Sequence, residues 1–373
     1  MPISRRKFLQ VSAGTAALLG ADLFGNPLLR QAFAQAVQET PIVWLAAGAC
    51  SGCSVSLLNA GAPRIQDILL GEVVPGHHTE LAFHQTVMAA SGDLAMEAMY
   101  AAEEKPFLLV VEGSVQTADN GRHCEVGEKD GHGITGLEHV LRLGRKAKAV
   151  LAVGSCASFG GVPAANMNPS GAKGVQAVFK EHGITTPVVN LPGCAIHPDW
   201  FVSTVATVLL AGPEAVKVDE FGRPLALYGK LIHDNCPLRG QFDAGRFAQK
   251  FGEAGCLYKL GCKGPVARAN CPEKKFNNGM SWCIENGHPC NGCVEPEYPY
   301  ARTMWGTVPL QQVTPPASYP PVFTDHKRPL DVTPGYAALA GVAAGVVGMR
   351  TLAKKSGDDK DQDDQGRNDE GRG

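Results

Sequence analysis

Cysteines are the residues of this chain with the clearest capacity for chemistry, and four of them follow strand-like segments. The runs PIVWLAAG, AKAVLAVGS and TTPVVNLPG are apolar and flanked by glycine or proline, which is typical of buried strands. The segments at their ends carry Cys50, Cys53, Cys156 and Cys194. Because the carboxyl ends of parallel strands meet at one edge of a sheet, we expect these thiols to converge there. Four thiolates around one point suit either a zinc ion or a cubane iron–sulfur cluster.

Two more groups of ligand-type residues lie in the second half of the chain. One group contains His233, Cys236, Cys256 and Cys262. The other, in CPEKKFNNGMSWCIENGHPCNGC, contains Cys271, Cys283, Cys290 and Cys293. The CxxC pair that ends this stretch recurs in both zinc and iron–sulfur sites. Cys124, in NGRHCEVGE, stays outside the three groups and is predicted to be a buried structural thiol, with a role near a cluster as the alternative.

Spacing alone does not decide between zinc and iron at these sites. Three structural zinc ions would be needed only if the fold had no core, and the first half of the chain is rich enough in apolar segments to form one. Three four-ligand sites without a nucleophile–base pair beside them indicate a row of electron carriers. This reasoning favours iron.

The elements that must position the thiols indicate an α/β fold. A fourth strand-like run, KPFLLVVEGS, joins the three above, and helix-length segments lie between the runs. The predicted helices are Ile65 to Leu70, Leu94 to Glu103, Gly136 to Leu143 and Trp200 to Leu210. We therefore predict a flavodoxin-like, doubly wound parallel sheet over residues 40–212 that holds the first thiol group. Residues 225–322 are predicted to form a cysteine-rich, largely irregular iron–sulfur domain, stapled by its cofactors.

The two ends of the chain carry sorting signals or low-complexity sequence. Residues 1–34 combine SRRKFLQ, an apolar stretch and Ala32-Phe33-Ala34, which is typical of a twin-arginine (Tat) signal peptide. That route carries folded proteins, so thiolates that already hold a metal would be unavailable for disulfides. Residues 333–355 fit a C-terminal membrane anchor and a soluble helix or exposed tail equally well, because the uninterrupted apolar run is short of the ~20 residues that a span needs. Residues 356–373 are polar and predicted to be disordered. The net charge of −2 gives no indication of nucleic-acid binding.

Several stretches together resemble the small, electron-transfer subunit of periplasmic nickel–iron hydrogenases over nearly the whole chain. They are SRRKFL, CSGCSVSLLNA, LLVVEGS, GSCASFGG, LPGCAIHPDW, IHDNCP, GCLYKLGCKGP and CNGCVEP. The resemblance implies that the first thiol group binds a proximal [4Fe–4S] cluster and that the His233 group binds a distal [4Fe–4S] cluster. It also implies that Cys271, Cys290 and Cys293 bind a medial cluster between them.

Cys283 departs from the commonest family pattern, in which proline stands at this position and the medial cluster is [3Fe–4S]. A fourth thiolate permits three [4Fe–4S] clusters, as in the nickel–iron–selenium branch. The stretches GRHCEVGE and SWCIENGHPCNGCVEPEYP also resemble that branch.

The resemblance implies a division of labour between subunits. Hydrogen would react at a nickel–iron centre in a hydrogenase large subunit, and this chain would pass electrons to or from an external partner. That partner would be a cytochrome c or a membrane cytochrome b, and the complex would reach the periplasm through the Tat export machinery. Two alternatives stay open: a stand-alone ferredoxin-like carrier, which would be isolated without nickel or a second chain, and a colourless, zinc-stapled envelope protein.

Overall fold

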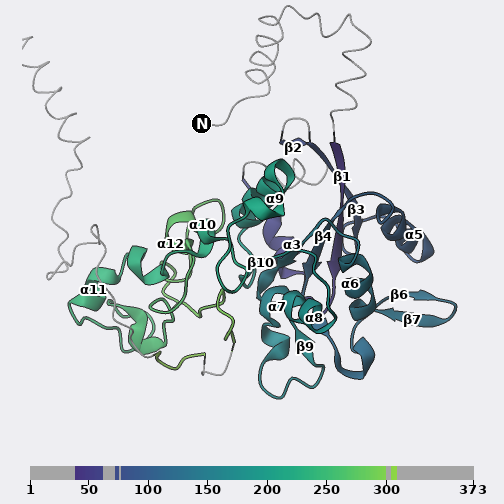
Figure 1. Cartoon of the computed structure of the whole chain (residues 1–373). Helices are drawn as coiled ribbons and strands as arrows, with labels where there is room; N and C mark the ends of the chain where they lie inside the picture. Colours follow the sequence, from purple (N-terminus) through teal and green to yellow (C-terminus); the bar gives the residue numbers. More distant parts are fainter. Residues whose placement is uncertain (1–37, 62–71, 75–76, 300–303, 309–373) are drawn as a thin grey trace, which may run out of the picture. The chain divides into compact units, whose positions relative to one another are not determined.

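The computed structural model describes residues 38–61, 72–74, 77–299 and 304–308, all within one compact unit, Met1–Pro320 (Figure 1). The predicted signal peptide at 1–34, the predicted helix at 65–70, the stretch 333–355 and the tail 356–373 lie outside the described residues. Among the helices that are described, none has the length and apolar character to cross a membrane.

A six-stranded sheet is the centre of the first half of the chain. Its order is β10-β8-β4-β1-β3-β2, and all neighbouring pairs except β2 with β3 are parallel. The strands are β1 (Gln38–Ala46), β2 (Glu72–Val74), β3 (His77–His84), β4 (Leu108–Glu112), β8 (Ala149–Val153) and β10 (Val188–Leu191). The five parallel strands follow the flavodoxin-like order 2-1-3-4-5, which confirms the predicted fold class.

Alternate side chains of the strands point to opposite faces, and helices cover both. Ile42 and Trp44 of β1 pack on the face covered by α3 (Gly52–Leu57) and α9 (Pro198–Ala211), whereas Val43 and Leu45 pack on the opposite face. The helices on that opposite face are α5 (Asp93–Ala102), α6 (Gly136–Gly144) and α8 (Val175–Glu181), as Figure 1 shows. Burial on both faces explains why strands β4 and β8 are apolar throughout, except for Glu112 at the end of β4.

Small elements extend the loops around this sheet. Two short antiparallel pairs are present, β5 (Val115–Gln116) with β9 (Ala172–Lys173) and β6 (Glu125–Lys129) with β7 (His132–Thr135). The loops also contain helix α7 (Gly154–Phe159) and the 3-10 turns η1 (Ala118–Gly121), η2 (Val162–Ala164) and η3 (Pro213–Ala215).

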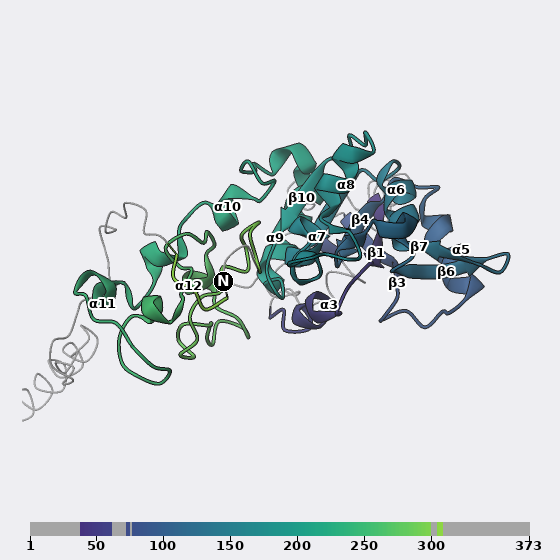
Figure 2. The same cartoon turned by 90° about the horizontal axis from the view of Figure 1, so that it is seen from below.

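The cysteine-rich region after the sheet consists of short helical segments in long irregular stretches (Figure 2). The segments are α10 (Leu225–Tyr228), η4 (Ile232–Asn235), α11 (Arg239–Asp243), η5 (Leu257–Leu260) and α12 (Cys271–Lys274). Its buried side chains, among them Tyr228, Trp282 and Val294, belong to the same apolar cluster as Trp44 and Trp200. The region therefore shares the core on one face of the sheet, in addition to any support from cofactors.

Candidate metal centres

The first thiol group lies where β1, β8 and β10 end. Cys50 precedes α3 and Cys53 lies within it, Cys156 lies in α7, and Cys194 follows β10. Burial, with a smaller contribution from the charges of Cys194 and Cys50, raises the pKa of Cys156 to about 11. Burial also raises the pKa of Cys53, with Glu112, Cys194 and Cys156 contributing. The four thiols are thus close enough to interact electrostatically, as expected from the strand order.

A buried carboxylate, missed in the sequence analysis, holds the loop of this group. Glu112, 2% exposed at the end of β4, accepts hydrogen bonds at Oε1 from the backbone N–H groups of Cys53 (3.0 Å) and Ser54 (3.2 Å). Its Oε2 accepts from Trp44 Nε1 (3.0 Å) and from the Ser54 hydroxyl. Glu112 therefore satisfies N–H groups at the start of α3 that have no partner within the helix. The signal in the sequence was a single charged residue that ends an otherwise apolar strand.

Glycine is required at the turn from β8 into α7. Gly154 has φ +86°, and a Cβ atom there would lie 2.6 Å from Cys53 Sγ. A side chain at this position would be strained in its backbone and would displace the thiol. The turn thus brings the chain close to Cys53 while it presents Cys156 two residues later.

The second group surrounds one cavity. His233, Cys236, Cys256 and Cys262 all line it, together with apolar side chains such as Leu257 and Ile284. Burial raises the pKa of Cys236 to about 12, and the charges of Cys262 and Cys256 contribute. The structure brings these four predicted ligands together.

The His233 imidazole has the properties of a ligand rather than of a satisfied core histidine. The residue is 4% exposed, and its Nε2 has no hydrogen-bond partner among the described residues. Burial, together with the charge of the nearby Arg239, lowers its pKa to about 4, so the ring is neutral at neutral pH. A neutral imidazole nitrogen is the form that binds metals. A buried nitrogen without a partner is costly, and coordination would satisfy it.

The third group collects around the stretch quoted above. Cys271 begins α12. Burial is the main cause that raises its pKa, and the charges of Cys293 and Cys283 raise it to a smaller extent. Cys290 is buried as well. Burial is the main cause that raises its pKa, and the charges of Cys262, Cys293 and Cys283 add to the increase. Cys283 therefore faces the other three thiols of its group, although it is more exposed than Cys271 and Cys290.

The three groups form a row. The pKa of Cys293 is raised to about 12, mainly by burial. The backbone N–H of Cys194 donates a hydrogen bond to the Cys293 sulfur, which opposes this increase. The first and third groups are therefore adjacent. The interaction of Cys290 with Cys262 makes the third and second groups adjacent. In the described part of the chain, no group of three or more His, Cys, Asp or Glu side chains could hold a single metal ion. A cubane cluster binds each of its ligands through a different iron atom.

Cys124 is placed apart from these groups. It lies between η1 and β6, is half-buried rather than fully buried as predicted, and burial raises its pKa. Its sulfur lies beside Gly136, where a Cβ atom would be 3.3 Å away. These contacts fit a packing role at the start of α6.

Comparison with known proteins decides the family. The model for the C-terminal part of NiFe/NiFeSe hydrogenase small subunits matches residues 228–305, and that for the 20 Kd subunit of NADH ubiquinone oxidoreductase matches residues 50–208. The chain is 41% identical over 316 residues to the periplasmic [NiFeSe] hydrogenase small subunit of Desulfomicrobium baculatum, which covers 81% of this chain and 98% of that protein. This chain belongs to the small subunits of NiFe and NiFeSe hydrogenases.

Other small subunits and a solved structure agree. The periplasmic [NiFe] hydrogenase small subunit 1 of Nitratidesulfovibrio vulgaris is 40% identical over 303 residues, 79% of this chain and 90% of that protein. The structure of the recombinant [NiFeSe] hydrogenase from Desulfovibrio vulgaris Hildenborough in the oxidised state superimposes with a TM-score of 0.66 at 42% identity. That match covers 70% of this chain and 95% of the other. The protein is thus the iron–sulfur, electron-transferring subunit of a hydrogenase, whose active centre is in a partner large subunit.

Proposed function

We propose that this small subunit carries electrons through three [4Fe–4S] clusters between the hydrogen-activating centre of the large subunit and an external acceptor. The proposal is supported chiefly by the row of ligand groups, in which Cys194 adjoins Cys293 and Cys290 adjoins Cys262. When bound, such clusters supply one-electron redox centres. The chain's own residues would hold them in sequence, exclude water from them and fix the gaps that the electrons cross.

The ligand sets follow the three groups. Cys50, Cys53, Cys156 and Cys194 would hold the proximal cluster, and His233, Cys236, Cys256 and Cys262 the distal one. The medial cluster would be held by Cys271, Cys283, Cys290 and Cys293. Cys283 makes this last set complete for a [4Fe–4S] cluster, and its electrostatic contact with Cys271 and Cys293 supports that role.

The proximal end would face the large subunit. Cys50 and Cys194 are exposed in this chain, whereas the thiols of Cys236, Cys256 and Cys262 are buried. Exposed apolar side chains lie close by in the sequence: Val55 and Leu58 are 56% and 66% exposed, and Val162 is 53% exposed. Such apolar exposure around a cluster site is expected where a permanent partner covers it.

The complex would act in the periplasm. Two relatives are named as periplasmic, and the arginine pair Arg5-Arg6 is the basis for export through the Tat machinery. The external acceptor would be a cytochrome c or a membrane cytochrome b that approaches the His233 end. Membrane attachment through residues 333–355 stays a hypothesis, because that stretch lies outside the described residues.

Purification under nitrogen tests this function. The chain should be isolated together with a nickel-containing large subunit, with about 12 iron atoms per small subunit if every four-ligand set holds a cubane. The complex should reduce a dye with hydrogen. Iron-loaded chain that is isolated without nickel or a second chain would contradict the proposal, and so would a colourless protein that contains zinc.

A further inference from the structure

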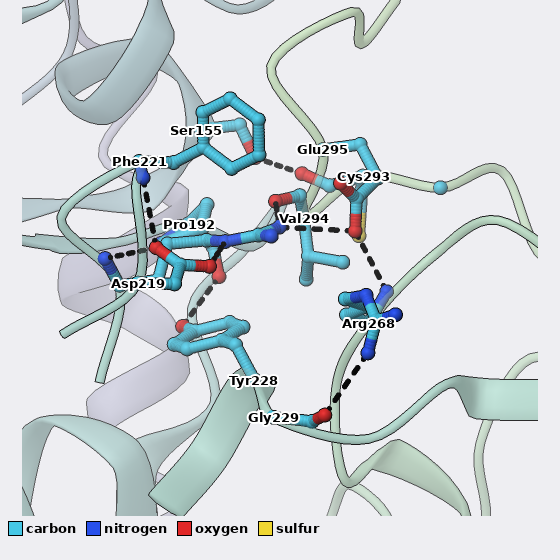
Figure 3. A network of polar contacts seen from close by, with 12 residues as sticks. Ser155, Pro192, Asp219, Phe221, Tyr228, Gly229, Arg268, Cys293, Val294 and Glu295 are labelled. Atoms are coloured by element: carbon cyan, nitrogen blue, oxygen red, sulfur yellow. Dashed lines mark hydrogen bonds and ion pairs between the residues drawn. The ribbon is translucent and has the colours of Figure 1, made fainter. Parts of the chain in front are cut away.

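A single buried hydroxyl joins the proximal and medial ligand segments. Ser155, 1% exposed, directly precedes Cys156, and its Oγ donates a hydrogen bond to the backbone carbonyl of Cys293 (Figure 3). The same Oγ accepts from the backbone N–H of Gly193 at 3.1 Å. A serine hydroxyl has one donor and can accept, so both of its roles are used here. Segments that carry Cys156, Cys194 and Cys293 thus meet at one oxygen.

Neighbouring contacts hold these segments independently of Ser155. Tyr228 donates its hydroxyl to the carbonyl of Pro192 at 2.8 Å, and Arg223, 1% exposed, donates to the carbonyl of Val294 at 2.9 Å. Arg223 also pairs with Glu295 at 3.0 Å (Glu295, Val294, Tyr228 and Pro192 are labelled in Figure 3). Removal of the Ser155 hydroxyl should therefore loosen the junction without unfolding the protein. The hydroxyl is the side-chain group that links the two ligand segments directly, beside the hydrogen bond from the backbone N–H of Cys194 to the Cys293 sulfur, which the loss of the hydroxyl leaves in place.

We infer that Ser155 is a positioning residue that sets the electronic coupling between the proximal and medial sites. This inference rests on the proposed function, because it needs a cluster at each site. One electron leaves one cluster and arrives at the other, with no bond made or broken. Electron transfer between buried centres depends steeply on their separation and on the bonded path between them. A hydrogen bond from the Cys156 segment to the Cys293 backbone would fix both.

The experiment compares Ser155→Ala with Ser158→Ala in the intact two-subunit complex, prepared under nitrogen. Ser158 lies on the same helix, is 3% exposed, and donates to the carbonyl of Ala152 at 3.2 Å, away from the medial segment. The measurements are iron and nickel content, the spin–spin splitting between reduced clusters by electron paramagnetic resonance, and hydrogen–deuterium exchange. The rate at which hydrogen reduces the distal cluster is followed by rapid mixing.

We expect Ser155→Ala to keep its iron and its exchange activity but to show a smaller splitting and a several-fold slower reduction of the distal cluster. Ser158→Ala should match the unaltered protein. The inference is overturned if Ser155→Ala keeps both the splitting and the rate, or if Ser158→Ala changes them equally. Loss of iron from Ser155→Ala alone also overturns it, since the hydroxyl would then retain a cluster rather than couple two. An unaltered complex without iron–sulfur signals would instead contradict the proposed function and, with it, this inference.

Discussion

At the scale of single residues, the three sites differ in the charge that their ligands contribute. The proposed proximal and medial sets would offer four thiolates each, whereas the proposed distal set would replace one thiolate with the neutral ring of His233. A cluster with less negative charge around it generally has a higher reduction potential. The exposed Cys283 and the buried His233 are thus the two proposed ligands whose replacement should have distinct effects.

Replacement of Cys283 tests the number of medial ligands. Cys283→Pro should convert the medial cluster to [3Fe–4S] and raise its potential, because one iron loses its thiolate. Electron paramagnetic resonance of the oxidised complex would show the new signal. Cys124→Ala is the matched control, since Cys124 lies outside the three groups and should leave the spectrum unaltered. An unchanged spectrum for Cys283→Pro would mean that Cys283 is not a ligand.

Replacement of His233 tests the exit of electrons. His233→Ala should open a coordination position at the distal end and disturb both its potential and its electronic coupling. Hydrogen–deuterium exchange, which needs no net electron flow, should persist, while hydrogen oxidation with the physiological acceptor falls sharply. His132→Ala, at an exposed position of β7, should change neither activity. Equal loss of both activities in an assembled His233→Ala complex would argue against a role at the exit.

At the scale of elements, the tight turn from β8 into α7 brings the chain close to the proximal thiols. Gly154 at the β8–α7 turn and Gly183 after α8 both have positive φ, +86° and +63°. Only at Gly154 would a Cβ atom meet a thiol, because nothing lies within 4 Å of the corresponding position at Gly183. Substitution at both glycines would strain the backbone, but only substitution at Gly154 would also place an atom against a thiol of the proposed proximal site.

Gly154→Ala should therefore cause loss of the proximal cluster, whereas Gly183→Ala should only lower the stability of the protein. Both changes force a left-handed conformation at about 1–2 kcal/mol. Iron content and thermal unfolding of the complex measure the two effects. We expect about four fewer iron atoms in Gly154→Ala, one cubane's worth, and full iron with a slightly lower melting temperature in Gly183→Ala. Equal iron content in both variants would show that the close approach at Cys53 is tolerated.

The sequence was informative wherever apolar runs were long. Strands β1, β4, β8 and β10 were predicted, because burial on both faces leaves continuous apolar runs. Strand β3 was missed, since its sequence HHTELAFH mixes polar and apolar residues. Helices α3 and α7, six residues each, are too short for helical periodicity to be detected.

The sequence predicted which ligand-type residues the structure brings together, but it did not predict the residues that support them. Cysteine spacing was sufficient to predict the three groups. Glu112 and Ser155 were not identified, because their roles depend on contacts 59 and 138 residues away along the chain. A hydrogen bond between distant segments leaves no periodic pattern in the sequence.

At the scale of the whole molecule, assembly should precede export. The twin-arginine route carries folded proteins, and the cysteine-rich region packs on the core of the sheet. A large subunit without its own signal would therefore cross the membrane only as a passenger of this chain.

Arg5→Lys with Arg6→Lys should leave a folded, cluster-loaded complex inside the cell. The large subunit should stay behind with it. Arg30→Lys, a conservative change elsewhere in residues 1–34, is the control and should allow export. Separation of periplasm from cytoplasm, followed by hydrogen-dependent dye reduction in each fraction, measures the outcome. Active enzyme in the periplasm of the double variant would show that SRRKFL is not the operative signal.

The shared apolar core also bears on thermal motion. Trp44 and Trp200 of the α/β part belong to one packed cluster with Trp282 and Val294 of the cysteine-rich part. The described portions of the two parts cannot swing as separate bodies without opening that cluster, which close packing resists. The gaps between redox centres should hence fluctuate little, so tunnelling would proceed without waiting for a hinge to close. Such a conductor would need no conformational gate, and the reduction potentials of its centres would set the direction of electron flow.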